Sequence, residues 1–349
     1  MLSMNKLKLM IVGMVLLSSS VFAQQKPYYT QYILNQYILN PALTGIENYT
    51  DLKLSYRNQW TNIPGSPQTM YMTVHAPIGK QDYKTTPTSY EPMGNNSIGN
   101  DWFEENVTSP SHHGLGLSII NDKTGYISRF SVSGSYAYHK GMSPKTTLSV
   151  GFQAGFSSVT VDRSKIDWGN TSMDPNDPAI GYATGELKKS MPELGVGLWL
   201  YSHDFFVGTS ILNIVPSKAK FVKNNKYGTY LVPHTFVTGG YRIPMSGGLT
   251  FLPSVLIQWV NPEPIQVHAN MKLQYEDKLW FGGSYRYTDK LGGFAIMTGI
   301  NVSNSLNIGY AYDFANNSRL RGYQGNTHEI IVGFLLGNKF REICPRCSW

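Results

Sequence analysis

The sequence has 349 residues, among them 34 glycines and 23 tyrosines, with only 15% charged residues and a formal net charge of +7. Lys6 and Lys8 lie in the first 23 residues, and subtracting these two from +7 leaves +5 for the rest. That charge is too small to indicate a nucleic acid partner. Low charge with abundant tyrosine is typical of a surface that meets lipid headgroups.

The first 23 residues have the pattern of a secretory signal peptide. Lys6 and Lys8 precede the apolar run 9–17, and Val21-Phe22-Ala23 resembles a cleavage site. A membrane helix would need roughly 20 apolar residues, and no stretch of the chain has them. We therefore expect export, a mature start near Gln24, and either a soluble protein or a closed β-barrel. Only helices and closed barrels satisfy their backbone in lipid.

Residues 24–50 form a segment that precedes the first predicted strand, and they contain QYILN twice, at 31–35 and 36–40. A five-residue step keeps a side chain on one face of neither a helix nor a strand, and a solenoid needs more copies. The doubling therefore predicts no architecture, and whether it is accidental stays open. We expect the segment in the periplasm or as a plug in the lumen.

The strand pattern is clearest at 265–275, where apolar and polar residues alternate from Ile265 to Tyr275. This is strand period 2 at the length of a tilted membrane strand. The polar faces of such stretches carry Ser, Gly, Asn and Gln, which suits a wet lumen, and Tyr275 stands where an aromatic girdle would lie.

Fourteen such strands are predicted, an even number as in single-chain bacterial barrels. They cover 51–60, 66–77, 113–121, 128–139, 145–159, 190–201, 204–213, 233–243, 248–259, 264–275, 278–287, 293–303, 304–314 and 327–338. The predicted fold class is all-β: a transmembrane outer-membrane β-barrel of about 14 antiparallel strands over 51–340, with a tail at 341–349.

The connections alternate in length, which predicts short periplasmic turns and long external loops at 160–189, 214–232 and 315–326. Residues 78–112 break the alternation. We interpret them as a periplasmic insertion, and a miscount of one strand is the alternative.

Charged residues on the polar faces are the candidate lumen site, either as ion pairs that brace the wall or as a basic lumen that contacts a plug or guest. They are Lys53, Arg57, Arg242, Lys272, Arg286 and Asp313. A second candidate is an external basic loop, which is either merely solvated or binds an acidic partner or lipopolysaccharide phosphates. It carries Lys218, Lys220, Lys223 and Lys226.

No catalytic signature occurs: the sequence has no GxSxG, HExxH or P-loop motif. We expect no enzyme, no metal site and no cofactor. His112 and His113 are adjacent and should face opposite sides of a strand. Cys344 and Cys347 form a lone CxxC near the end, which we interpret as a possible disulfide or an idle tail.

The ordered set of motifs resembles the PorP/SprF-type outer-membrane proteins of the Bacteroidetes type IX secretion system. It comprises QQKPYYTQYILN…NPALTG near the start, YRNQW (56–60), APIG (76–79), GLGLSIIND (114–122), PELGVGLW (192–199), FFVGTSI (205–211), WFGGSYR (280–286), IGYAYDF (308–314) and THEIIVGF (327–334). The 78–112 connection and the CxxC tail depart from the family pattern.

This resemblance implies an interaction role without catalysis. The family's N-terminal pattern is matched by candidate plug or partner contacts at Tyr29, Gln31, Tyr32, Asn40, Pro41, Ala42 and Gly45. The implied partner is a secreted type IX substrate, such as a large adhesin bound through its C-terminal targeting domain, which the barrel helps to export or to attach to the cell surface. A core component would also contact a periplasmic peptidoglycan-binding lipoprotein and other secretion subunits.

The alternative is a plugged channel for hydrophobic or small solutes. Pro253 within the predicted strand 248–259 would interrupt the hydrogen-bond ladder and could open a lateral gap.

Overall fold

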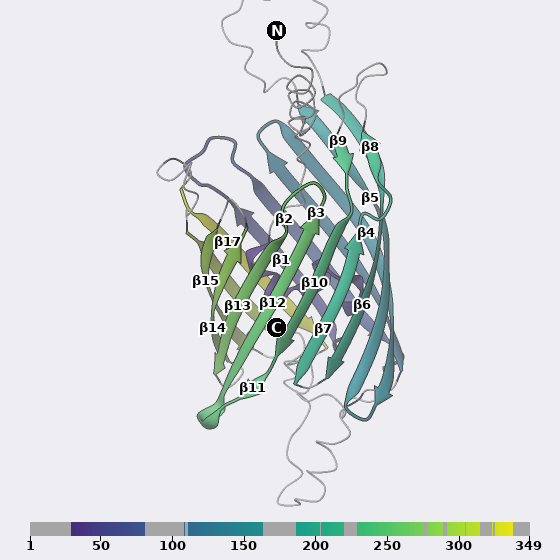
Figure 1. The fold of residues 1–349 in the computed structure, drawn as a ribbon, viewed down its shortest axis with the longest axis vertical. Coiled ribbons are helices and arrows are strands. Elements are labelled where there is room, and N and C mark those ends of the chain that lie inside the picture. The colour runs from purple at the N-terminus through teal and green to yellow at the C-terminus, as the bar shows by residue number, and fades with distance from the viewer. Residues whose placement is uncertain are drawn as a thin grey trace, which may run out of the picture.

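The computed structural model describes residues 29–80, 108, 111–162, 186–202, 204–219, 229–275, 278–288, 292–303, 305–314, 323 and 325–337. Fourteen strands form one closed antiparallel barrel, which confirms the predicted fold class (Figure 1). The ring closes because β1 pairs with β17 and β10 pairs with β12.

The barrel strands are β1 (Thr50–Asn58), β2 (Gln68–Ile78), β3 (His112–Thr124), β4 (Ile127–Ser143), β5 (Thr146–Asp162), β6 (Glu186–Ser202), β7 (Phe205–Leu212), β10 (His234–Tyr241), β12 (Leu249–Val260), β13 (Gln266–Tyr275), β14 (Leu279–Tyr287), β15 (Gly293–Ser303), β16 (Leu306–Asp313) and β17 (Thr327–Leu336). Each overlaps one predicted strand. The short strands β8 (Ser217–Ala219) and β9 (Thr229–Leu231) pair with each other, and β11 (Ile243–Pro244) pairs with β12.

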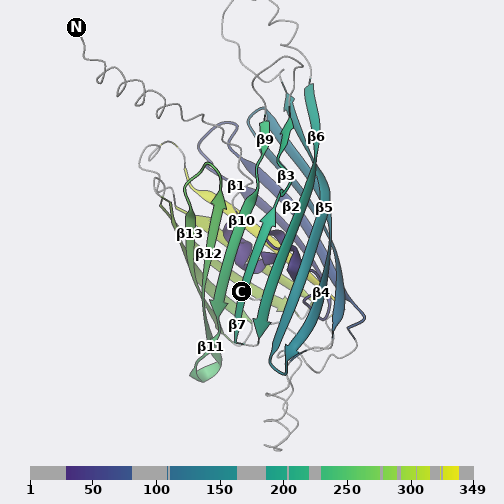
Figure 2. The same cartoon turned by 45° about the vertical axis from the view of Figure 1, so that its right-hand side comes forward.

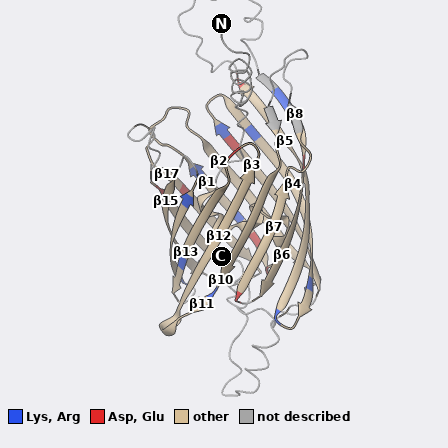
Figure 3. Cartoon of the chain, in the orientation of Figure 1, with Lys and Arg blue, Asp and Glu red and all other residues tan. Residues whose placement is uncertain are grey.

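The alternating sequence pattern produces a wall with two different faces. On β13, Gln266, Asn270 and Lys272 are 2–5% exposed and face the lumen, whereas Met271 is 61% exposed and Tyr275 47% exposed on the outside. Figure 3 shows how sparse charged residues are along the strands. Exposure of these outward apolar side chains to water would be unfavourable, whereas their contact with lipid is favourable. The exterior therefore has the character of a membrane barrel. No helix among the described residues has the length and apolar character needed to cross a membrane.

The connections place the two ends of the barrel. At one end, called the short-turn rim here, β4 joins β5 through 144–145 and β6 joins β7 through 203–204. The opposite end, the long-loop rim, carries the connections 163–185, 213–233 and 314–326. The long connection between β2 and β3 begins and ends at the short-turn rim. Because β2 pairs directly with β3, the sheet has no missing strand between them, and the predicted strand count is correct.

The wall is tallest at β4, β5 and β6, each of 17 residues. β6 pairs with β7 only from Gly195 onward, so 186–194 continue past the end of β7 toward the long-loop rim. Val159, Met191 and Leu231 pack there into a small apolar cluster, which ties β9 to β5 and β6. We call these strand ends and the β8–β9 hairpin the rim platform; Figure 1 shows β8 and β9 beside the tall wall.

The ladder is interrupted at Pro253, as predicted. β10 pairs with β12 as far as Gly240–Ser254, and pairing resumes at Ile243–Phe251 on β11. Proline has no N–H to donate on that side, whereas pairing with β13 continues through Pro253–Met271. β10 ends at Tyr241, so Arg242 follows the strand, and its predicted inward position stays a prediction. Arg242 is half-buried in this break between β10 and β11, where its N–H donates to Asp204 O at 2.6 Å.

Candidate functional site

The N-terminal segment lies inside the barrel, where both cartoon views show its purple turns (Figures 1 and 2). It makes three short 3₁₀ turns: η1 (Thr30–Leu34), η2 (Gln36–Ile38) and η3 (Pro41–Leu43). Its first residues contact the long-loop ends of β1, β16 and β17, and its last residues reach the short-turn rim before β1 begins. Of the two predicted placements, the structure therefore has the plug.

The doubled QYILN corresponds to two successive 3₁₀ turns, η1 and η2. Each copy makes one 3₁₀ turn and ends at an asparagine with extended φ, −143° at Asn35 and −142° at Asn40. Because the chain changes direction at each asparagine, equivalent side chains reach different walls. Asn270 on β13 donates to the Tyr32 hydroxyl, whereas the Tyr37 hydroxyl lies 2.7 Å from Ser135 Oγ on β4.

The two asparagines anchor the turns to the wall. Asn35 Nδ2 donates to Thr73 Oγ1 at 2.9 Å. Asn40 Nδ2 donates to the carbonyl oxygens of Leu198 at 3.0 Å and Thr209 at 3.2 Å, and its Oδ1 accepts from Ala42 N at 2.9 Å. Asn40 thus bonds to two wall carbonyls and caps η3 at the same time, so the second asparagine is held more firmly than the first.

Tyrosine rings of the plug are buried against the wall. Tyr32 is 3% and Tyr37 is 5% exposed. Tyr29 is 6% exposed and packs edge-on against Tyr71 of β2, with ring centroids 5.2 Å apart.

Wall glycines allow the plug backbone to approach the sheet closely. A Cβ at Gly151 would lie 2.3 Å from Ala42 N, and one at Gly197 would lie 1.9 Å from Asn40 Oδ1. Gly45 of the plug has φ +74°, and a Cβ there would lie 2.5 Å from Gly114 Cα. These contacts place Pro41, Ala42 and Gly45 directly on the inner face of β3, β5 and β6.

Histidines and a lysine hold the end of the plug at the short-turn rim. His139 Nε2 donates to Thr44 O at 2.8 Å, and His112 Nε2 donates to Gly45 O at 3.2 Å. Lys80 Nζ donates to the carbonyl of Ile46 at 2.9 Å. His112 is buried and His113 exposed, so the adjacent pair faces opposite sides of β3 as predicted. Among the described residues, no group of three or more metal-ligating side chains occurs.

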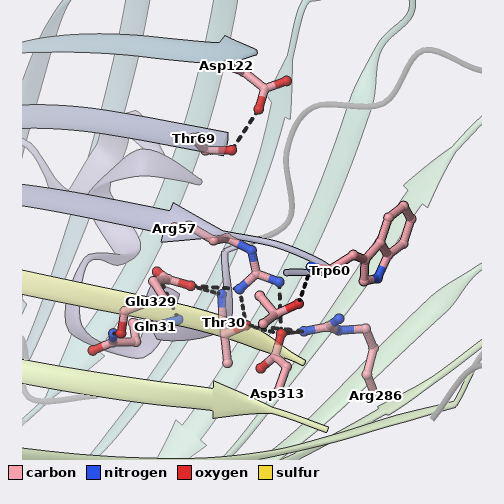
Figure 4. Close-up of polar contacts among 10 residues, drawn as sticks. Thr30, Gln31, Arg57, Trp60, Thr69, Asp122, Arg286, Asp313 and Glu329 are labelled. Carbon is pink, nitrogen blue, oxygen red and sulfur yellow. Dashed lines mark hydrogen bonds and ion pairs between the residues drawn. The ribbon is translucent and has the colours of Figure 1, made fainter. Parts of the chain in front are cut away.

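An ion cluster ties the first plug residues to the long-loop half of the lumen (Figure 4). Arg57 donates to Glu329 Oε2 and Asp313 Oδ2, each at 2.8 Å, and also to the Thr30 hydroxyl. Thr30 in turn donates to both acids: its N–H to Glu329 Oε2 at 2.8 Å and its hydroxyl to Asp313 Oδ2 at 2.7 Å. The plug thus completes the coordination of an ion pair that belongs to the wall.

Two flanking contacts extend this cluster. Arg286 Nη2 lies 3.6 Å from Asp313 Oδ2, and Gln31 Nε2 donates to Glu329 O at 2.6 Å. Two arginines face two carboxylates, so the cluster is balanced in charge. Arg57 is 2% and Glu329 1% exposed. Removing one partner from such a buried group leaves the others unpaired in a poorly solvated place, which costs far more than an exposed pair would.

The remaining predicted lumen charges lie apart from this cluster. Lys53 pairs with Asp51 at 2.5 Å, and Lys272 lies over the Trp280 ring, 5.1 Å from its centroid. Of the external lysines, Lys218 belongs to β8, while Lys220, Lys223 and Lys226 lie outside the described residues, as do Cys344 and Cys347. Their predicted roles stay predictions.

Sequence reasoning missed Glu329, which contacts the plug at both Thr30 and Gln31. The signal was present, because Glu329 is a lone carboxylate at an inward position of the strand 327–338. It also missed the lumen acid Asp122, which accepts from Thr69 Oγ1 at 2.6 Å.

Little space remains between plug and wall at two places. A hollow lined by Tyr29, Tyr32 and His268, among others, measures about 20 Å³, and one beside Asn35, Tyr37 and His75 also measures about 20 Å³. Each has room for about one water molecule.

The family model described as "Type IX secretion system membrane protein PorP/SprF" matches residues 21–334. A comparison with curated protein sequences gives no match. Among solved structures, the chain is similar to the Acinetobacter baumannii outer membrane protein Omp33, with 10% identity, TM-score 0.45, and 84% of this chain and 100% of that chain covered.

It is also similar to the Pseudomonas putida toluene transporter TodX, with 8% identity, TM-score 0.45, and 88% of this chain and 94% of that chain covered. At these identities and TM-scores the likeness supports no argument about what the chain does.

The asparagine anchors give a first prediction. Asn40→Ala removes three hydrogen bonds and Asn35→Ala removes one to Thr73, each worth about 1 kcal/mol. We expect Asn40→Ala to lower the free energy of unfolding by about 2–3 kcal/mol and Asn35→Ala by about 1 kcal/mol, measured by urea unfolding of the purified barrel in detergent micelles. Equal losses would contradict the stronger anchoring of Asn40.

The ion cluster gives a second prediction. In a Cys344→Ser, Cys347→Ser background, Ile33→Cys should react slowly with a water-soluble thiol reagent, because Ile33 is 3% exposed. Adding Arg57→Met leaves Asp313 and Glu329 without their shared partner, a loss of about 3 kcal/mol. We expect labelling to become at least tenfold faster.

The matched control for that experiment is Lys272→Met, which removes a buried lumen cation outside the ion cluster. It should leave the labelling rate unchanged. Equal acceleration by both variants would mean that general loosening of the barrel, rather than the Arg57 cluster, controls access to the plug.

Proposed function

The chain belongs to the PorP/SprF family of type IX secretion system membrane proteins, and from this premise we propose that it is a non-enzymatic outer-membrane partner of a secreted protein. It binds a secreted type IX substrate, such as a large adhesin through its C-terminal targeting domain, at the long-loop rim. There it supports export of that substrate or its attachment to the cell surface.

The observation that carries this proposal is the seated plug. The plug is bonded to β1, β16 and β17 near one rim and to β3 and β4 near the other. A lumen filled by bonded chain favours binding at the rims over passage of solute through the barrel.

The rim platform supports the proposed binding side. Seventeen-residue strands are longer than the roughly 9–11 residues that a tilted membrane strand needs. The extra length of β6 carries its own apolar cluster with Met191 and Leu231, which gives a partner a fixed surface. Long connections are typical of the extracellular side, so we assign the long-loop rim to the cell exterior and the short-turn rim to the periplasm.

The core-machinery role is the variant of this proposal in which the periplasmic side also binds. Its contacts would include the 78–112 connection, which begins and ends at the short-turn rim, with a peptidoglycan-binding lipoprotein and other secretion subunits as partners. The channel is the second candidate function, and the interrupted ladder at Pro253 is the observation in its favour.

The experiment is a pull-down of the tagged full chain from native membranes in mild detergent, with partners identified by mass spectrometry. We expect one large secreted protein at near-equal amount. Replacing 217–231 by a short Gly-Ser link removes the β8–β9 hairpin and should reduce that partner at least tenfold.

The control variant replaces the turn 245–248 at the short-turn rim by Gly-Ser residues and should retain the partner. Both variants must still migrate as folded barrels in unheated detergent gels. Recovery of a periplasmic lipoprotein with both variants would indicate core machinery. Recovery of the barrel alone, with conductance in planar bilayers, would contradict the proposal and favour the channel.

A further inference from the structure

The lipid-facing side of the barrel has a hollow of about 440 Å³ over β10, β12, β13, β14 and β15. It is distinct from the lumen, because residues with large outward exposure form its sides. Met271 is 61%, Tyr241 52% and Tyr285 51% exposed.

The hollow exists because small residues occupy the outward positions of four consecutive barrel strands. They are Gly239 on β10, Pro253 on β12, Ala269 on β13 and Gly283 on β14. The strand register brings these small residues close together. Val255 pairs with Gly239 on one side and with Ala269 on the other. Met271 likewise pairs with Pro253 on one side and with Gly283 on the other. The nearest atom to a Cβ added at Gly239 would be 3.6 Å away, and the nearest to one added at Gly283 would be 3.9 Å away.

The walls of the hollow are apolar side chains that rise around this floor. Val255 and Phe294 complete the sides begun by Tyr241, Met271 and Tyr285. The apolar side chains of the walls can make dispersion contacts with a bound molecule along their length. In an empty hollow of this size those contacts would not be made.

The floor is held in place from the lumen side. Asn270 and Ser284 also line the hollow, yet are 3% and 4% exposed because their side chains face the lumen. Asn270 donates to the hydroxyl of Tyr32, so the seated plug backs the wall at this point. A backed floor makes the hollow a preformed site.

We propose that this hollow is a binding site for one hydrocarbon chain of a membrane lipid. The outer face of a membrane barrel is surrounded by acyl chains, which are narrow and flexible enough to enter a groove floored by glycine, alanine and proline. A second barrel would present a convex wall, which covers the flanks of a groove without filling it. The proposal does not depend on which partner binds the rims.

The test uses the full chain in vesicles of phosphatidylethanolamine and phosphatidylglycerol, doped with a phosphatidylcholine that carries a diazirine in one acyl chain. After irradiation, labelled positions are mapped by mass spectrometry and compared between like residues. We expect Met271 and Tyr285 to be labelled at least threefold more than Met70 and Tyr56, which are 55% and 41% exposed elsewhere on the outside.

Gly283→Leu fills the hollow and should reduce this excess labelling to the level of Met70 and Tyr56. The matched control is Gly134→Leu on β4, an outward glycine whose nearest atom to an added Cβ is 3.9 Å away, and it should leave the excess unchanged. If Gly283→Leu does not fold, Ala269→Leu takes its place.

Three results would overturn the proposal. One is equal labelling of Met271 and Met70, and another is excess labelling that survives a folded filling variant. The third is the formation of a direct crosslink between two copies of the chain through this face. That result would assign the hollow to a second copy of the chain.

Discussion

A closed sheet of fourteen strands encloses more space than its own inward side chains fill, and the rest of this structure follows from how that space is occupied. The chain fills it with its own residues before β1. The plug must satisfy its backbone groups inside the barrel, and the wall supplies partners for them. Ser149 Oγ donates to Ala42 O at 2.6 Å and Ser210 Oγ donates to Leu39 O at 2.6 Å. Small polar side chains and glycines on the inner face are therefore a consequence of the plug.

The same constraint explains where the charges lie. A lone arginine in the lumen would be costly, but Arg57 is enclosed by Glu329, Asp313 and the Thr30 hydroxyl. The plug and the wall satisfy each other's polar groups in this cluster. This mutual dependence links the seated plug to the closed barrel, and it is why we place partner binding at the rims.

The barrel was predictable from sequence because apolar and polar residues alternate with period 2 along its strands. The same period also correctly predicted that the side chains of Arg57, Lys272 and Asp313 face the lumen. The predicted strand 233–243 ran past the actual end of β10 at Tyr241, which lies opposite the break at Pro253. The plug contacts were not predictable in detail, since 3₁₀ turns have no comparable pattern. The contact from Thr30 to Glu329 spans 299 residues of chain, and no local signal encodes such a pairing. The repeat QYILN was visible, but its meaning required the direction changes at Asn35 and Asn40.

The central claim is that residues 30–45 form a permanently seated plug, and hydrogen–deuterium exchange of the full chain in lipid nanodiscs tests it most directly. Amides in this segment that bond to the protein, such as those of Thr30, Ala42 and Thr44, should exchange as slowly as those of β1 and β17. Exchange of these amides within seconds, while the strands stay protected, would show that the segment leaves the lumen and would contradict the account.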